Sequence, residues 1–296
     1  MIDVVMLAYN QSEYISQAIE SALSQKGVEL RLIIGEDCST DNTLKICKQY
    51  KGKYPEKIVL LESERNLGLA LNYKRCFDCC TSEYIAILEA DDYWIDIFKL
   101  KKQLNIFNQD HDIGLVHCNT YILYQSKSKK IKARRYSFDN LSGFIFSDLF
   151  KENSIYALTV VFRRSLLHMI DYNYVIDNNF LSIDYYLWLN FARVSKIGFL
   201  DNYVSVYRVL DSSISNNIDK YKVLTFIYTS VKVITYLYEN NYISEKLYQY
   251  KLRKLRFEIL IKSLQLKDIR MIINNLKHFS IKFLFHKLYI KNVLLR

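Results

Sequence analysis

The first 124 residues of the chain alternate short apolar runs with amphipathic stretches. A short continuous apolar run predicts a buried strand, whereas apolar residues at i, i+3 and i+4 predict one face of a helix. The runs predict strands at 4–8, 30–34, 58–61 and 84–88, and the amphipathic stretches predict helices at 12–25, about 39–50 and 66–80. Strands that alternate with helices are typical of a parallel, doubly wound α/β sheet with right-handed crossovers.

The C-terminal part of the chain does not show this alternation. Residues 216–296 contain no Gly or Pro and are expected to be helical. We therefore expect an α/β domain over 1–215 and a helical C-terminal region over 216–296. No stretch reaches the ~18 apolar residues of a membrane span, because Lys232 interrupts the nearest candidate, 223–238. No basic region precedes the first apolar run, so we expect no signal peptide and a cytoplasmic protein.

Composition narrows the class of protein. Half of the residues are hydrophobic, with seven Gly and one Pro, which excludes a disordered or collagen-like chain and argues against a turn-rich barrel. The formal net charge is +10, yet residues 1–215 contain 25 basic and 26 acidic side chains, whereas 216–296 contain 16 and 5. The positive excess therefore belongs to the C-terminal region. No recognised binding motif accompanies it, so we expect no nucleic-acid partner.

The cysteines indicate a reducing compartment. There are six, and Cys76, Cys79 and Cys80 fall within one predicted helix of a chain without an export signal. We expect reduced thiols. Cys76-x-x-Cys79 has no second pair at useful spacing, so zinc is not expected.

Polar and mostly acidic residues follow three of the predicted strands. They are Tyr9-Asn10, Glu36-Asp37 and Glu89-Ala90-Asp91-Asp92. The carboxyl ends of parallel strands bind ligands in such sheets. Three carboxylates within four residues repel one another, and Mg²⁺ or Mn²⁺ completed by substrate phosphates would relieve that repulsion. A solvated acidic turn and, for Asp37, an ordinary helix cap explain the same residues, so these interpretations remain open.

In order and spacing, these elements resemble the family 2 inverting glycosyltransferases of GT-A fold, over about residues 2–215. The segments that carry the resemblance are Val5-Met6-Leu7-Ala8-Tyr9-Asn10 with Glu13, Asp37 in its acidic turn, Asn66-Leu67-Gly68, and Glu89-Ala90-Asp91-Asp92. The resemblance implies a GT-A-type, doubly wound, mostly parallel, Rossmann-like sheet, with a C-terminal helical extension.

The resemblance also implies a reaction. A sugar would pass with inversion from a nucleoside diphosphate sugar to a hydroxyl of a glycan or lipid-linked glycan. The family's common setting is the biosynthesis of a bacterial surface polysaccharide such as lipopolysaccharide or capsule. The resemblance assigns the general base to Asp184 and a divalent cation, Mn²⁺ or Mg²⁺, to Asp91 with Asp92 in support. The donor contacts that it assigns are Ala8, Tyr9, Asn10, Glu13, Asp37, Asn66, Glu89, Ala90 and Asp91.

Several positions depart from the family pattern. Ile183 stands where a Glu usually precedes the base, and Leu210 replaces a His in the tail 207–215. Metal binding would then be weaker, or be completed by Asp211 or water. A non-catalytic nucleotide-sugar-binding relative therefore remains an alternative. A nucleotidyltransferase fits less well, because 8–12 is neither Gly-rich nor basic.

Two further segments leave alternatives open. Residues 159–164 resemble the strand that lines the acceptor side, although Arg163 and Arg164 also fit a solvated strand end. Residues 251–296 mix basic and apolar side chains, as in attachment to an anionic membrane surface. That would place the protein on the inner face of the cell membrane. A helical cap with a solvated basic face fits the same pattern.

Overall fold

The computed structural model describes residues 1–133, 141–210 and 220–277. The chain divides into two compact units, Met1–Ser213 and Ile214–Arg296. The boundary expected at residue 215 falls within 211–219, outside the described residues.

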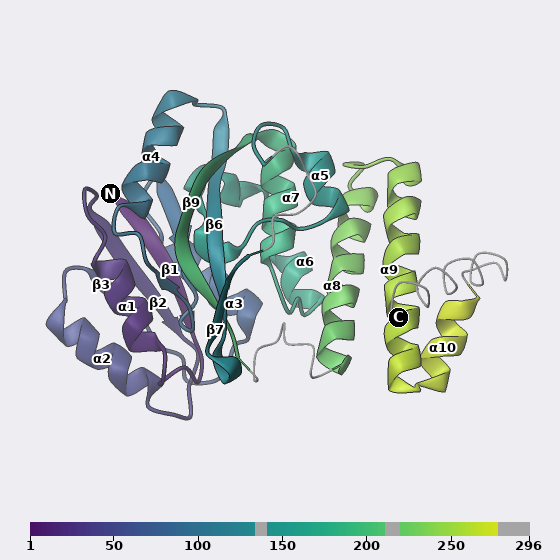
Figure 1. Ribbon diagram of the computed structural model, residues 1–296, viewed down its shortest axis with the longest axis horizontal. Coiled ribbons are helices and arrows are strands. Elements are labelled where there is room, and N and C mark those ends of the chain that lie inside the picture. Colours follow the sequence, from purple (N-terminus) through teal and green to yellow (C-terminus); the bar gives the residue numbers. More distant parts are fainter. Residues whose placement is uncertain (134–140, 211–219, 278–296) are drawn as a thin grey trace. The chain divides into compact units, whose positions relative to one another are not determined.

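The first unit is built on one nine-stranded mixed sheet (Figure 1). Its strands are β1 Ile2–Ala8, β2 Leu30–Glu36, β3 Ile58–Leu61, β4 Tyr84–Ile87, β5 Tyr93–Trp94, β6 Ile113–Tyr124, β7 Lys129–Lys132, β8 Val161–Arg163 and β9 Lys196–Val209. Their order is β3-β2-β1-β4-β8-β6-β9-β5, and β7 pairs with β6. β3, β2, β1 and β4 are parallel, as the sequence predicts.

The hydrophobic pattern predicted no strand in the other half of the sheet, although residues 159–164, which contain β8, resemble a strand of the family. β8 runs antiparallel to both β4 and β6, and the long strands β6 and β9 pair in parallel along most of their length. β8 lies between β4 and β6, so it joins the parallel half to the strands formed by residues 113–124 and 196–209.

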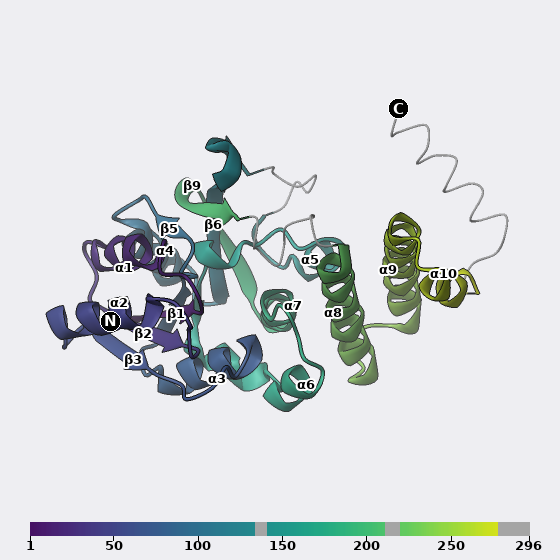
Figure 2. The same cartoon turned by 90° about the horizontal axis from the view of Figure 1, so that it is seen from below.

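Helices cover both faces of the sheet. They are α1 Ile15–Leu23, α2 Thr43–Lys53, α3 Leu69–Cys79, α4 Lys99–Gln109, α5 Phe146–Lys151, α6 Tyr172–Asp177 and α7 Asp184–Val194, with short 3₁₀ turns η1 Gln125–Lys127, η2 Ala157–Thr159 and η3 Arg164–Met169. Figure 2 shows α1 and α4 on one face and α3 and α7 on the other. The three helices predicted from the amphipathic pattern are confirmed as α1, α2 and α3.

The central strand β1 is buried on both faces, which explains its continuous apolar run. Val4 and Met6 lie in a core cluster with Ile15 and Ile19 of α1, and all four are fully buried. Val5 alternates to the opposite face and is also fully buried. Burial of such a side chain contributes about 2 kcal/mol, so β1 is held firmly in the middle of the parallel half.

An aromatic cluster fills the other face. The ring of Phe162 in β8 lies 6.0 Å from that of Phe77 in α3, 6.3 Å from Trp188 and 5.1 Å from Phe191, both in α7. Offset and edge-to-face aromatic pairs add roughly 1 kcal/mol each to their burial. This packing fixes α7 against the sheet and thereby fixes the position of its first residue, Asp184.

The second unit contains three described helices, α8 Lys220–Glu239, α9 Glu245–Leu266 and α10 Ile269–Leu276. α8 and α9 pack together, with the rings of Tyr238 and Tyr248 stacked at 4.5 Å. Ser244 and Asp268 cap the N-termini of α9 and α10. The expected helical C-terminal region is therefore present. None of the described helices is long and apolar enough to cross a membrane.

Candidate active site

The carboxyl ends of β1, β2 and β4 meet at one edge of the sheet. Ala8 is in register with Glu36, and the backbone N–H of Asp37 donates to the carbonyl of Ala8 at 3.0 Å. On the other side of β1, the N–H of Ala90 donates to the carbonyl of Leu7 at 3.3 Å. The three polar segments singled out in the sequence are therefore brought together.

The turns after β1 and β2 are joined to each other by hydrogen bonds. Oδ1 of Asn10 accepts the backbone N–H of Thr40 at 2.8 Å, and the N–H of Asn10 donates to the Ser39 hydroxyl at 3.0 Å. Asn10 adopts the left-handed φ of 53° that this exchange requires. Beside it, Tyr9 is 44% exposed and Glu13 is exposed. Both side chains are thus accessible to a ligand beside this fixed turn.

Asp41 strengthens the same turn. Its carboxylate accepts the N–H groups of Ser12 at 3.0 Å and Thr43 at 2.8 Å. Burial raises the pKa of this carboxyl, but the hydrogen bonds from Thr43 and Ser12 outweigh it and bring the pKa to about 2. Asp41 is therefore ionised at neutral pH and keeps the two loops together.

Asp37 has a structural task that the sequence did not reveal. It is 3% exposed, and its two carboxylate oxygens accept the backbone N–H groups of Leu67 at 2.8 Å and Gly68 at 3.0 Å. Gly68 takes a φ of 80°, which favours glycine. Nδ2 of Asn66 donates to the Asp37 carbonyl at 3.3 Å. Asp37 therefore shapes the Asn66–Gly68 loop, and its contact with a nucleotide stays a prediction.

The Glu36 carboxylate is also occupied by hydrogen bonds from the backbone. It accepts the N–H groups of Cys38 at 3.2 Å and Ser39 at 2.8 Å, and the residue is fully buried. One residue earlier, the carbonyl of Gly35 accepts Nδ2 of Asn72 at 2.9 Å. A Cβ at Gly35 would lie 2.4 Å from Oδ1 of Asn72, so only glycine permits this approach. Glu36 thus braces the turn that carries Asp37.

Glu89 follows β4, and one of its carboxylate oxygens accepts a hydrogen bond whereas the other does not. Oε1 accepts the Tyr73 hydroxyl at 3.1 Å, whereas Oε2 is buried without a hydrogen-bond partner among the described residues. Burial raises the pKa of Glu89 to about 7, and the charges of Asp91 and Asp184 add to the rise. An unpartnered buried carboxylate oxygen among other carboxylates is the environment that a bound cation relieves.

Asp91 and Asp92 have different surroundings. Oδ1 of Asp92 accepts the backbone N–H of Arg208 at 2.7 Å, and Asp92 is 1% exposed. Burial raises the pKa of Asp92 well above its usual range, and Asp91 and Glu89 add to this. Burial also raises the pKa of Asp91, although the Arg208 charge opposes the rise. Asp91, which is less buried, is the better placed of the two to reach a ligand.

The carboxylates of the acidic motif could supply only some of the ligands that a divalent cation needs. Oxygen ligands from one or two carboxylates, completed by substrate phosphates, are the usual set for Mg²⁺ or Mn²⁺. The unpartnered Oε2 of Glu89 and the raised pKa of Asp91 agree with such an ion. Within the described part of the chain, however, no three His, Cys, Asp or Glu side chains form a complete protein site. The donor's phosphates would have to supply the remaining ligands.

Arg208, which the sequence placed only in a tail, is a buried cation at the acidic motif. It is 5% exposed, and its guanidinium carbon lies 5.0 Å from the Tyr14 ring centroid and 4.5 Å from that of Tyr93. Nη1 donates to the Asp91 carbonyl and Nη2 to the Gln17 side chain. Only its long-range contacts reveal this role, because an Arg in a strand carries no such signal by itself.

Leu210 closes β9 and is 5% exposed, so an apolar side chain fills the place of the family's His. Asp211, the suggested substitute ligand, lies outside the described residues. The cysteines, which are all described, form no disulfide. Cys76 is buried in α3, and burial raises the pKa of its thiol to about 12. It is therefore neutral at pH 7.

Asp184 is the first residue of α7, and its charge acts on Glu89 of the acidic motif. Its carboxylate accepts the Ser182 hydroxyl and, at 3.3 Å, Nδ2 of Asn153. Burial raises the pKa of Asp184, and these hydrogen bonds oppose the rise. Besides burial, the charges of Glu89 and Asp184 both raise the pKa of the Tyr73 hydroxyl. The Asp184 carboxylate therefore lies close enough to the acidic motif for their charges to interact.

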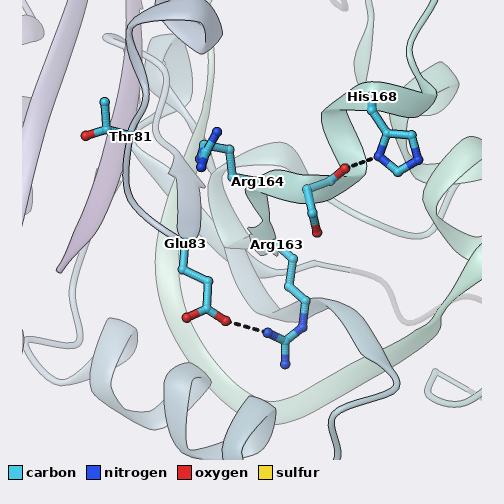
Figure 3. A pocket seen from close by; sticks show the side chains of 6 residues that line it. Thr81, Glu83, Arg163, Arg164 and His168 are labelled. Carbon is cyan, nitrogen blue, oxygen red and sulfur yellow. Dashed lines mark hydrogen bonds and ion pairs between the residues drawn. The ribbon is translucent and has the colours of Figure 1, made fainter.

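The structure places Arg163 and Arg164, and both interpretations of residues 159–164 stay predictions. β8 crosses the sheet beside β4, but it runs antiparallel, so Arg163 is in register with Tyr84 at the start of β4. The acidic motif follows the other end of β4. The two arginines therefore lie away from the carboxylates. Arg164 is exposed, whereas Arg163 is half-buried and pairs with Glu83 (Figure 3).

Comparisons with known proteins agree with this geometry. The sequence profile of glycosyl transferase family 2 matches residues 3–170. Rv1520 of Mycobacterium tuberculosis (strain ATCC 25618 / H37Rv) is 29% identical over 208 residues, which are 70% of this chain and 58% of that protein. The chain thus spans less than two thirds of that relative's length.

Another relative is more nearly matched in length. UDP-Glc:alpha-D-GlcNAc-diphosphoundecaprenol beta-1,3-glucosyltransferase WfgD of Escherichia coli is 28% identical over 224 residues, 73% of this chain and 80% of that protein. Among solved structures, mannosyltransferase PcManGT from Pyrobaculum calidifontis, in complex with GDP-Man and Mn²⁺, has a TM-score of 0.63 at 14% identity. It covers 100% of this chain, which covers 80% of PcManGT. At that identity the likeness shows the fold, and it confirms the GT-A type expected from the sequence.

Proposed function

This chain belongs to glycosyl transferase family 2, and on that premise we propose that it transfers a sugar from a nucleoside diphosphate sugar to an acceptor hydroxyl, with inversion. The observation that carries the proposal is that the polar segments after β1, β2 and β4 meet at one edge of the sheet, and that Asp184, the first residue of α7, lies close enough to Glu89 for its charge to act on that carboxyl. A carboxylate base on α7 and an acidic motif after β4 are the two groups that such a transfer needs near the reacting carbon.

The donor would lie across the carboxyl ends of β1, β2 and β4. The ring of Tyr9 is half exposed beside the fixed turn at Asn10, and is available to contact the base. Glu13, Ala8 and Asp37 line the same edge, and Asn66 belongs to the loop that Asp37 holds. Glu89, Ala90 and Asp91 would meet the phosphate and sugar end. The names of WfgD and PcManGT include UDP-Glc and GDP-Man, which supports a nucleoside diphosphate sugar as the donor class.

A divalent cation, Mn²⁺ or Mg²⁺, would be held by Asp91, with Asp92 positioned behind it by Arg208. When bound, the ion supplies positive charge to the diphosphate leaving group. The chain adds a fixed charge of its own, because the guanidinium of Arg208 is buried next to Asp91. A preorganised cation is effective in stabilising charge that develops on a leaving group.

Asp184 would act as the general base. The acceptor hydroxyl attacks the anomeric carbon as its O–H proton passes to the Asp184 carboxylate, and the bond to the diphosphate oxygen breaks. A single displacement inverts the configuration at that carbon. The raised pKa of Asp184 brings it nearer to neutral pH, where a base is more effective. Ser182 and Asn153 hold the carboxylate in place.

The acceptor would be a glycan or a lipid-linked glycan of a bacterial surface polysaccharide, such as lipopolysaccharide or capsule. The name of WfgD, whose acceptor is a diphosphoundecaprenol-linked sugar, supports a lipid-linked acceptor. The basic C-terminal region, of which 251–277 is described, would hold the protein against the anionic inner face of the membrane.

A panel of nucleotide sugars tests the proposal. The full chain is screened for a donor that raises its melting temperature, with and without Mn²⁺, and the selected donor is then assayed for hydrolysis and for transfer to a lipid-linked acceptor. We expect one donor to bind and to be turned over. Donor binding without any turnover would instead identify the chain as a non-catalytic nucleotide-sugar-binding relative.

A further inference from the structure

The hydroxyl of Tyr73 in α3 donates to Oε1 of Glu89 at 3.1 Å, and Tyr73 is 4% exposed. The other oxygen of this carboxylate, Oε2, is buried and has no hydrogen-bond partner among the described residues. Because the bond to Oε1 restrains the rotation of the carboxylate, it also sets the direction of Oε2. We propose that Tyr73 is a positioning residue for glycosyl transfer, which orients the Glu89 carboxylate toward the donor. The proposal rests on the function proposed above and adds to it a residue that no motif of the sequence singled out.

The core of the first unit fixes the ring of Tyr73. The ring stacks on that of Phe77, one turn further along α3, with the centroids 5.3 Å apart and the planes 24° apart. Phe77 in turn meets the ring of Phe162 in β8 edge to face at 6.0 Å. Aromatic pairs of this kind add roughly 1 kcal/mol each to the burial of the rings. The hydroxyl is therefore brought to Glu89 on a rigid support, as the precise placement of a site residue requires.

The residue before Tyr73 ties the same helix to another strand. Nδ2 of Asn72 donates to the carbonyl of Gly35 in β2 at 2.9 Å. Two adjacent residues of α3 thus bind the end of β2 and the acidic motif after β4. The helix therefore sets the spacing between the turn that carries Asp37 and the carboxylate of Glu89.

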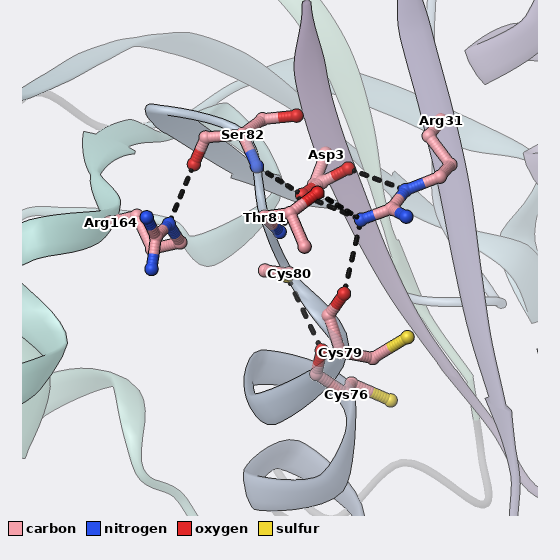
Figure 4. A network of polar contacts seen from close by, with 8 residues as sticks. All are labelled: Asp3, Arg31, Cys76, Cys79, Cys80, Thr81, Ser82 and Arg164. Atoms are coloured by element: carbon pink, nitrogen blue, oxygen red, sulfur yellow. Dashed lines mark hydrogen bonds and ion pairs between the residues drawn. The ribbon is translucent and has the colours of Figure 1, made fainter.

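The C-terminal end of α3 is also anchored (Figure 4). Nη2 of Arg31 donates to the carbonyl of Cys79, the last residue of the helix, at 3.0 Å. Nε of Arg31 donates to the buried carboxylate of Asp3 in β1 at 2.9 Å. Side chains of β2 and β1 therefore hold both ends of α3, and Tyr73 lies between the two attachments.

The hydrogen bond between Tyr73 and Glu89 lies near the reacting groups. Besides burial and the charge of Glu89, the charge of Asp184 raises the pKa of the Tyr73 hydroxyl, so the base proposed above is close to this bond. A displaced Glu89 should therefore disturb the reaction more than it disturbs binding of the nucleotide. Misplacement of a group by about 1 Å can reduce a rate by about 10²-fold.

Tyr73→Phe tests the proposal in the full chain, because it removes the hydroxyl and keeps the ring. We expect kcat for hydrolysis of the donor to fall by at least about tenfold. The dissociation constant of the donor should change by less than about threefold, which distinguishes positioning from binding. Tyr50→Phe is the matched control, since its hydroxyl donates to Oε1 of Glu20 at 2.6 Å between α2 and α1. Its kcat should equal that of the wild type.

Glu89→Asp tests whether Tyr73 acts through Glu89. The aspartate keeps the charge but is one methylene shorter, so its carboxylate is withdrawn from the Tyr73 hydroxyl. In this background Tyr73→Phe should change kcat by less than about twofold, because residues that act through one contact are not additive. An equal loss in both backgrounds would show that Tyr73 does not act through Glu89 and would overturn the proposal.

The same measurements separate this proposal from the proposed function. Wild-type protein that turns over no donor contradicts both. If the wild type is active, two results overturn the role of Tyr73 alone: a kcat of Tyr73→Phe within about twofold of wild type, and a rise in the donor dissociation constant equal to the fall in kcat. Melting temperatures establish that the variants fold. Should Tyr73→Phe melt below the assay temperature, Glu89→Asp decides, because it breaks the same bond from the other side, and an unchanged kcat would equally refute the role.

Discussion

The backbone N–H of Arg208 donates to Oδ1 of Asp92 at 2.7 Å, across 116 residues of sequence. Through this bond the end of β9 holds the acidic motif that follows β4. The side chain of Arg208 then returns to the same motif and donates to the carbonyl of Asp91. One residue therefore fixes the position of the carboxylates and adds positive charge next to them.

Arg208→Gln should reduce turnover by about 10²–10³-fold, the usual loss when a preorganised charge at a leaving group is removed. The backbone N–H that holds Asp92 remains in the variant, so the loss should follow the charge and not the position of the motif. The measurement is kcat at saturating donor and Mn²⁺. Exposed Arg253→Gln serves as the control when turnover is measured as hydrolysis of the donor, in which no membrane takes part. Arg208→Gln with turnover within twofold of wild type would contradict the assignment.

Asp184→Asn should reduce transfer by about 10²–10⁴-fold while donor binding persists, because the change removes the proton acceptor but keeps the shape of the side chain. The measurements are the transfer rate and the donor dissociation constant. Asp177→Asn in α6, an exposed position nearby in sequence, is the matched control. A loss of donor binding equal to the loss of rate would show that Asp184 acts in binding and not as a base.

The parallel half of the fold could be predicted because a strand that is buried on both faces appears in the sequence as a continuous apolar run. β1 is buried on either side and reads as one apolar run, and a parallel arrangement then forces the polar residues at the ends of β1, β2 and β4 to one edge. The meeting of Asp37 with the acidic motif follows from that topology.

Other features had no local signal. β8 is three residues long and lies between two 3₁₀ turns, so no periodicity marks it, and only the likeness of residues 159–164 to a family strand indicated it. The contact of Arg208 with Asp92 depends on pairing between distant strands. Glu36 stands next to Asp37 and has the same charge, yet its carboxylate is used by the backbone of its own turn. Short-range hydrogen bonds of this kind distinguish neighbouring acids that look alike in sequence.

A buried histidine should make the first unit sensitive to acid. His117 is 2% exposed, and its Nε2–H donates to the Leu141 carbonyl at 2.9 Å. Burial lowers its pKa from 6.5 to about 4, although the hydrogen bond opposes this. Between these pH values the unfolded chain binds a proton that the folded chain does not, so stability falls as pH decreases, by about 3 kcal/mol in all.

His117→Gln should remove this component, since the amide can still donate but does not titrate. The free energy of unfolding is measured by urea denaturation between pH 7.5 and 4 in wild type, in His117→Gln and in the exposed control His111→Gln. We expect the difference between wild type and His117→Gln to change with pH, and the control to parallel the wild type. Parallel curves for all three proteins would refute the role of His117.

In the second unit, α10 presents apolar side chains to solvent. Ile269 is 70% exposed and Ile273 is 62% exposed, one helical turn apart. Exposed Lys267, Arg270 and Lys277 flank them. Large exposed isoleucines near basic residues are typical of helices that lie in a membrane interface, where the apolar face enters the acyl boundary and the cations meet anionic headgroups.

Replacement of both isoleucines by serine should therefore lower binding to phosphatidylglycerol vesicles by at least about tenfold, since burial of each side chain contributes roughly 1.5 kcal/mol or more. Because surface charges are screened by salt, wild-type binding should also weaken as ionic strength rises. Vesicle sedimentation measures both effects, and Asn274→Ser, an exposed polar position on the same helix, is the control. If the double variant binds as the wild type does, α10 is not the attachment surface. If wild type does not sediment with these vesicles, the basic region is a solvated helical cap, because cations that met headgroups would give a salt-dependent attraction.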